Sequence, residues 1–145
     1  MAEVTPDQLE AYLTEYGWTF EAHGLNLWTT GFQGERRTFP MNIRWTPTCL
    51  SFEVRPYLDL GVDWPRSPEL ARDLLELNAR MQLVKVGLSE TGEVLLSCQV
   101  LVAGFDYECF GRILGIIGYY ADELAPEIYS KVEIYDPERR PTLLS

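Results

Sequence analysis

Few residues in this chain have side chains that could do covalent chemistry. A thiol dyad would need His23, the single histidine, beside Cys98 or Cys109, because a thiolate nucleophile requires a base and positive surroundings. Both cysteines fall in segments whose apolar pattern predicts a core position, and His23 adjoins Gly24 in a predicted turn. We therefore interpret all three cysteines, Cys49 included, as buried free thiols, and we predict no catalytic residue and no enzyme activity.

Metal and phosphate sites also lack support in the sequence. Three cysteines without paired spacing favour neither a disulfide framework nor a zinc site. Asp59 and Asp63 flank Gly61 like part of a calcium loop, but the intervening residues supply no further side-chain oxygen ligands. No glycine-rich phosphate loop occurs. The sequence therefore predicts no metal and no cofactor, and the aspartates are interpreted as turn and helix-entry residues.

The charge balance limits the classes of partner. Twelve lysines and arginines stand against 22 aspartates and glutamates, which gives a formal net charge of −10. Nucleic acids and anionic membranes bind clustered cations, so we expect neither as a partner. The chain has no apolar run of about 18 residues, and its N-terminus carries acid where a signal peptide carries base. We therefore expect a cytoplasmic protein.

The elements that would position these residues follow from hydrophobic periodicity. The 145 residues suit one domain, which we place at residues 1–136, with a C-terminal tail at 137–145. A capped helix after Thr5 is followed by alternating strands, a second helix after Ser67, a hairpin and a long final helix. The order α-β-β-β-β-α-β-β-α predicts an α+β fold, in which helices pack on an antiparallel sheet.

Two hairpins can be assigned in register because their inward-facing residues agree. Pro40 cannot donate to a ladder, which predicts an edge strand or a bulge at that point. Pro126 predicts a kink or the end of the last helix, so residues 132–135 could form a short extended piece. The predicted pairs are Trp45 with Leu50, Ile43 with Phe52, Met41 with Val54, Val84 with Cys98, Val86 with Leu96 and Leu88 with Val94.

The final helix has an unusually wide apolar surface. One face carries the residues expected in the core, and an adjacent strip carries Cys109, Ile113, Ile116 and Tyr120. A third side presents only glycines, which cost about 1 kcal/mol each in a helix unless another element approaches closely. The strip is either covered within the domain or buried against a second subunit. We predict the second arrangement, a homodimer that uses these four residues.

Four aromatic residues lie outside the alternation that predicts the core: Trp28, Phe32, Tyr57 and Trp64. Exposed aromatic side chains are enriched at binding surfaces, so we predict that these residues contact a partner polypeptide. If the four side chains instead closed around a cavity, they would form an aromatic-lined pocket for a small molecule. Trp64 could also simply cover the start of the second helix.

Several segments resemble the YbjN family, which is described as bacterial sensory transduction regulators and has a fold similar to type III secretion chaperones. The resemblance implies three strands before the second helix, where the residues themselves predict four, and commonly a homodimer. It implies no catalytic residues. The matching segments are 12–13, 17–18, Leu74-Leu75-Glu76-Leu77-Asn78, Lys85-Val86-Gly87-Leu88, Gly92-Glu93-Val94, Phe105 and Ala121-Asp122-Glu123-Leu124.

Together these features predict a non-enzymatic, cytoplasmic, bacterial protein that binds another polypeptide as a chaperone, an adaptor or a regulator. The alternative is a small-molecule sensor or regulator that uses the aromatic residues as a pocket.

Overall fold

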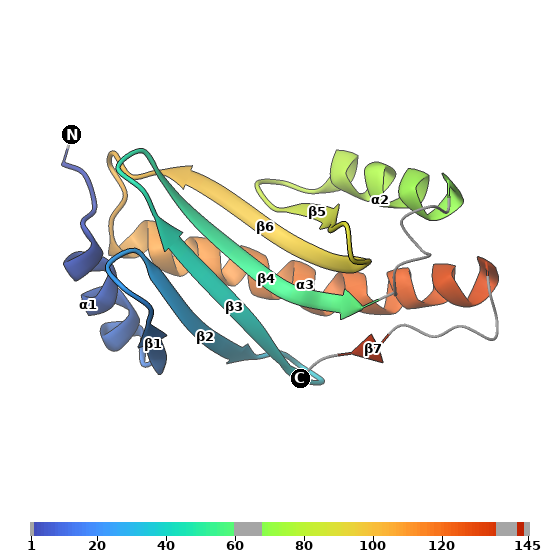
Figure 1. Ribbon diagram of the computed structural model, residues 1–145, viewed down its shortest axis with the longest axis horizontal. Helices are drawn as coiled ribbons and strands as arrows, with labels where there is room; N and C mark the ends of the chain where they lie inside the picture. The colour runs from blue at the N-terminus through green and yellow to red at the C-terminus, as the bar shows by residue number, and fades with distance from the viewer. Residues whose placement is uncertain (1, 60–67, 136–141, 144–145) are drawn as a thin grey trace.

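The computed structural model describes residues 2–59, 68–135 and 142–143 (Figure 1). The predicted order of helices and strands is confirmed, including four strands before the second helix, and a two-residue strand is added near the C-terminus. The elements are α1 (Pro6–Tyr16), β1 (Phe20–Ala22), β2 (Leu27–Gln33), β3 (Thr38–Trp45), β4 (Cys49–Asp59), α2 (Pro68–Arg80), β5 (Lys85–Leu88), β6 (Glu93–Leu101), α3 (Tyr107–Tyr135) and β7 (Thr142–Leu143).

The strands form one antiparallel sheet in the order β1-β2-β3-β4-β6-β5, and β7 pairs with β4. Figure 1 shows α3 running along one face of the sheet, with α1 beside its first turns and α2 near β5. The opposite face carries polar side chains such as Asn42 and Glu53, which lie opposite one another on β3 and β4. This two-layered arrangement, with helices on one face of an antiparallel sheet, is the predicted α+β fold.

Five of the six predicted strand pairs are found in the sheet, and the Val84–Cys98 pair is not, because β5 begins at Lys85. β3 is an interior strand, so the prediction that Pro40 marks an edge strand is wrong. Pairing between β3 and β4 starts only at Met41 and Val54, after which β4 has an irregularity before Leu58. Pro40 therefore pairs with Gly31 of β2 without facing a ladder partner on β4.

The ends of α1 have the predicted caps. Thr5 and Gln8 form a capping box, in which each side chain accepts a hydrogen bond from the backbone N–H of the other. Gly17 ends the helix in the left-handed conformation, at φ 86°. Leu9 and Leu13 are completely buried, so this short helix is stabilised mainly by packing against the rest of the domain.

α3 begins at an aspartate cap and continues through a proline. The N–H of Cys109 donates to the Asp106 carboxylate over 2.9 Å, and this holds the pKa of Asp106 below its usual value. The predicted extended piece at residues 132–135 is wrong, because the helix runs past Pro126 to Tyr135. Ile128 and Val132 are fully buried beyond the proline, and each contributes about 1.5–3 kcal/mol of burial. That contribution offsets the roughly 3 kcal/mol that an interior proline costs.

The glycine side of α3 faces aromatic rings. A β-carbon added at Gly111 would lie 3.6 Å from the ring of Tyr16, and one at Gly118 would lie 3.9 Å from the ring of Phe32. Both distances are ordinary van der Waals contacts, so a β-carbon would fit at either position, and the close approach that would require glycine is not found there. A β-carbon at Gly115 would meet no atom within 4 Å.

Candidate functional site

Two of the aromatic residues predicted at a binding surface lie in the core instead. Trp28 is 1% exposed and Tyr57 is 0% exposed, so the prediction that they are available to a partner is wrong. Trp28 pairs with Ile43 on the helix-covered face of the sheet, where the largest side chains exclude most water. Phe32 is half-buried and stacks on Trp18, with ring centroids 5.7 Å apart. Trp64 lies outside the described residues.

Tyr57 joins the sheet to the last helix. Its hydroxyl donates a hydrogen bond to the backbone carbonyl of Ala121 in α3, and burial raises the pKa of this hydroxyl well above its usual value. Sequence reasoning missed this role because β4 is irregular between Val54 and Leu58, which disrupts the alternation that would have identified an inward residue. The signal available in the sequence was a large aromatic residue, Tyr57, directly after Pro56.

The strip predicted as a dimer interface lies along a surface groove beside the first half of α3. Ile113 is buried, whereas Cys109, Ile116 and Tyr120 are half-buried and keep part of their apolar surface in contact with water. The hollow has a volume of about 530 Å³. We call it the β6 groove, and its lining residues are Leu83, Val100, Leu101, Ala103, Gly104, Phe105, Cys109, Arg112, Ile113 and Ile116.

Exposed apolar side chains border this groove. Leu83 is 57% exposed and Leu101 is 64% exposed, and Tyr119 on the neighbouring turn of α3 is 61% exposed. Leu83 also has a backbone φ of 67°, a left-handed conformation that costs a non-glycine residue roughly 1–2 kcal/mol. The N–H of Val84 donates to the carbonyl of Gln82 over 2.7 Å, so Leu83 is the central residue of a tight turn that leads into β5.

The strand that forms one wall of the groove is only partly paired on its outer side. β5 pairs with β6 no further than Lys85 opposite Ser97, so the described residues leave 98–101 without a neighbouring strand on that side. The side chain of Asn78 binds both the N–H and the carbonyl of Val86, which therefore point away from β6. Alternation along an antiparallel ladder then directs the backbone groups of Gln99 and Leu101 toward the unpaired side.

The structure does not bring a histidine to a cysteine. His23 hydrogen-bonds Thr29 over 2.8 Å beside β1, at one edge of the sheet, whereas Cys98 lies on β6. Three strands separate β1 from β6, a distance of about 19 Å at the usual strand spacing. Burial also raises the pKa of the Cys98 thiol, which disfavours the nucleophilic thiolate. The absence of enzyme activity remains a prediction.

Two further observations concern classes of site. Within the described ranges, no three histidine, cysteine, aspartate or glutamate side chains are grouped closely enough to bind a metal ion. Among the helices of these same ranges, none combines the length and the apolar character that crossing a membrane requires. Of the two aspartates interpreted as turn and helix-entry residues, Asp59 ends β4, and Asp63 lies outside the described residues.

The comparison with known families covers most of the chain. The profile of the YbjN family, described as "Putative bacterial sensory transduction regulator", matches residues 5–130. No curated protein sequence matches the chain.

Solved structures with the same fold include a YbjN protein and a type III secretion chaperone. The crystal structure of YbjN from E. coli, described as a transcription regulator, has a TM-score of 0.61 at 19% identity and covers 87% of this chain and 96% of its own. The Yersinia pestis type III secretion chaperone SycH, solved with a fragment of YscM2, has a TM-score of 0.55 at 16% identity, with coverages of 80% and 95%. A chain of the ExsC–ExsE complex has a TM-score of 0.54 at 17% identity, and the match covers 85% of this chain and 94% of that chain. The type III secretion chaperone-like fold is thereby confirmed.

Proposed function

This chain belongs to the YbjN family, and from that premise we propose that it is a non-enzymatic protein that binds another polypeptide in the β6 groove. The observation that carries the proposal is the combination of an apolar hollow with an unpaired stretch of strand at its wall. An apolar hollow alone would suit many ligands. An adjoining row of unsatisfied backbone groups specifically favours a polypeptide, which can supply the matching N–H and carbonyl groups.

The bound segment would be extended and would lie beside residues 98–101 of β6. Its backbone would pair with Gln99 and Leu101, while alternate side chains would enter the groove against Ile116 and Leu83. Arg112, which already pairs with Glu108 over 2.7 Å, lies at the rim and would contribute little to the binding free energy.

Two solved relatives of the fold support this reading. SycH was crystallised with a fragment of YscM2 and ExsC with ExsE, so proteins of this fold are found in complexes with other polypeptides. Their low sequence identity means that their particular partners do not transfer to this chain. A chaperone, adaptor or regulatory role in the cytoplasm remains the function that we propose.

Leu101→Asp is expected to reduce partner binding at least tenfold, because a charge at the groove would lose its hydration when a polypeptide covers it. The measurement is quantitative co-purification of tagged protein from the native host, followed by mass spectrometry of the bound chains. Leu25→Asp is the matched control, since Leu25 is 86% exposed at the β1–β2 turn, outside the groove. A bound polypeptide that is retained equally by both variants would contradict the proposed site.

Self-association through Cys109, Ile113, Ile116 and Tyr120 remains a separate prediction, because a second copy of the chain could occupy the same groove. Light scattering at micromolar concentration is expected to give about twice the 16.6 kDa chain mass. Ile116→Asp should shift the protein to monomer while leaving it folded, since Ile116 is only half-buried. A wild-type mass of one chain at all concentrations would rule out the dimer, and loss of folding in the variant would assign Ile116 to the core.

A further inference from the structure

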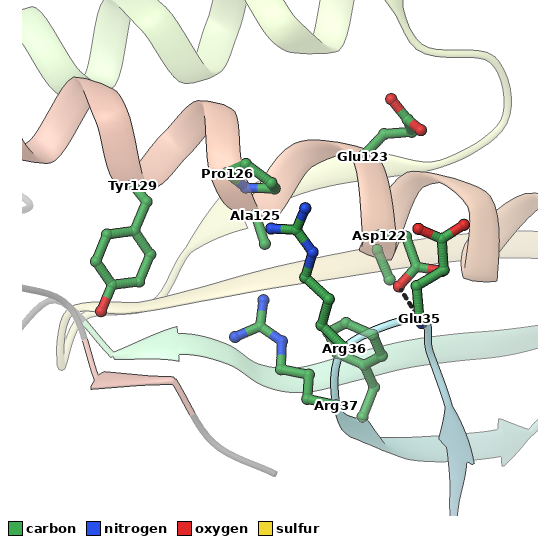
Figure 2. A pocket seen from close by; sticks show the side chains of 10 residues that line it. Glu35, Arg36, Arg37, Asp122, Glu123, Ala125, Pro126 and Tyr129 are labelled. Carbon is green, nitrogen blue, oxygen red and sulfur yellow. Dashed lines mark hydrogen bonds between the residues drawn. The ribbon is translucent and has the colours of Figure 1, made fainter.

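A second hollow, separate from the β6 groove, lies between the β2–β3 turn and the later half of α3. Its volume is about 440 Å³, within the range of small-molecule sites. Figure 2 shows Arg36 and Arg37 extending from the turn toward α3, with Pro126 and Tyr129 on the helix beside them. The hollow therefore combines two guanidinium groups with an apolar wall that includes Phe39, Ala125 and Pro126.

Arg37 is held in place by aromatic rings rather than by a carboxylate. Its guanidinium carbon lies 4.8 Å from the ring centre of Phe39 and 5.6 Å from that of Tyr57. Its Nη1 atom is buried and has no hydrogen-bond partner in the described part of the chain. A buried donor without a partner is costly, so the guanidinium of Arg37 does not use its full hydrogen-bonding capacity within the described residues.

The turn that carries the two arginines is fixed before any ligand arrives. The N–H of Gly34 donates to the carbonyl of Arg37 over 2.7 Å, and the N–H of Glu35 donates to Asp122 of α3 over 2.9 Å. A β-carbon at Gly34 would lie 2.5 Å from the same Asp122 oxygen, so the turn sits directly against the helix. Because the backbone positions of the two arginines are already set, little conformational freedom would be lost when a ligand binds.

The surrounding charges indicate which anion would fit. Glu35 and Glu123 are exposed at the rim and are screened by water, whereas Asp122 already accepts a backbone hydrogen bond. Three nearby carboxylates would repel a phosphate group of charge about −2 more strongly than a carboxylate of charge −1. A carboxylate also matches the fork of donors on a guanidinium.

We propose that this hollow binds a small organic acid, whose carboxylate pairs with the guanidinium of Arg37 and whose apolar body lies against Phe39 and Pro126. Arg36, which is exposed and has no ion pair within the described residues, would add long-range attraction at the entrance. The site shares no residue with the β6 groove, so it goes beyond polypeptide binding and would give the protein a separate small-molecule input.

Titration calorimetry of the full chain with benzoate tests the ligand class. Saturable binding of benzoate is expected, at least tenfold tighter than that of phenyl phosphate, and benzylamine should show none. The absence of saturable benzoate binding would overturn the proposal. Tighter binding of phenyl phosphate would overturn the assignment to a carboxylate, and tighter binding of benzylamine would show that the rim carboxylates, not Arg37, govern the site.

Variants test the role of Arg37. Arg37→Met keeps most of the apolar stem and removes the charge, so the dissociation constant for benzoate should rise at least tenfold. Arg44→Met, on the exposed face of β3, is the matched control and should bind benzoate as the wild type does. Without ligand, the thermal midpoint of Arg37→Met should stay close to that of the wild type, because removal of a buried unpaired donor offsets the loss of the guanidinium contacts with the rings of Phe39 and Tyr57.

Two results decide against this site, and the second separates its failure from failure of the proposed function. Equal benzoate binding by Arg37→Met and wild type would overturn the role of Arg37. If Arg37→Met does not fold, Arg37→Lys provides the same comparison, since it retains the charge but loses the fork, and should weaken benzoate binding severalfold. If the wild-type protein binds no benzoate but still co-purifies with a polypeptide, the proposal for this hollow is overturned and the proposal for the β6 groove stands.

Discussion

Phe110→Ala should lower the free energy of unfolding by about 3–5 kcal/mol, the largest effect expected from a single change in this protein. Phe110 is 0% exposed, and its ring is the point at which three elements meet. The ring centroid lies 5.9 Å from Tyr12 of α1 and 6.2 Å from Phe52 of β4. Truncation to alanine would leave a cavity that rigid neighbours could not collapse to fill, so both the transfer and the cavity costs apply.

Urea denaturation followed by circular dichroism measures this change. Tyr119→Ala is the matched control on the same helix, because Tyr119 is 61% exposed and its loss should change stability by no more than about 1 kcal/mol. A loss below 1 kcal/mol for Phe110→Ala would show that α1 and the sheet are not held together through this ring.

Gly34→Ala and Gly115→Ala should change stability in opposite directions, although both substitutions add one methyl group. At Gly34 the new β-carbon would lie 2.5 Å from Asp122 and closer still to the buried ring of Phe39, so a cost of about 1–3 kcal/mol is expected. At Gly115 no atom lies within 4 Å, and alanine should stabilise the helix by about 1 kcal/mol.

The two variants also differ in what they do to function. Gly34→Ala would move the turn away from α3 and should weaken benzoate binding along with stability, whereas Gly115→Ala leaves that turn untouched. Thermal and urea unfolding give the stability difference, and calorimetry gives the affinity. If Gly34→Ala is as stable as the wild type, the turn is not packed against α3 as tightly as its Asp122 contact indicates.

The hydrophobic pattern allowed much of the fold to be predicted because each element records its own periodicity. Alternation over β3 and β4 placed Ile43 opposite Phe52, and capping residues placed the start of α1 at Pro6. Such signals are local, and a one-residue slip would move every inward side chain to the wrong face. The prediction was wrong at two prolines. Beyond Pro126, the burial of Ile128 and Val132 outweighs the proline penalty, whereas Pro40 lies where β3 has no ladder partner on β4.

The candidate sites could be predicted only in part. The apolar strip on the last helix was visible from spacing, and three of its four residues, Cys109, Ile113 and Ile116, line the β6 groove. The aromatic residues did not predict a binding surface. Trp28 and Tyr57 could by their residue type lie either in the core or at an interface, and only their neighbours in the fold decide that they are buried. The involvement of Leu83 and Leu101 gave no periodic signal at all.

The sequence by itself determined the α+β class, most of the register in the β3–β4 and β5–β6 hairpins, both ends of α1 and the acidic balance, since these depend on neighbouring residues and on composition. Only the tertiary structure decided that β5 stops short of residues 98–101 and that Arg37 lies on the rings of Phe39 and Tyr57. Both features join residues that are distant in the chain. The free energy of such contacts comes from burial and desolvation after the elements have packed, and no local pattern records it.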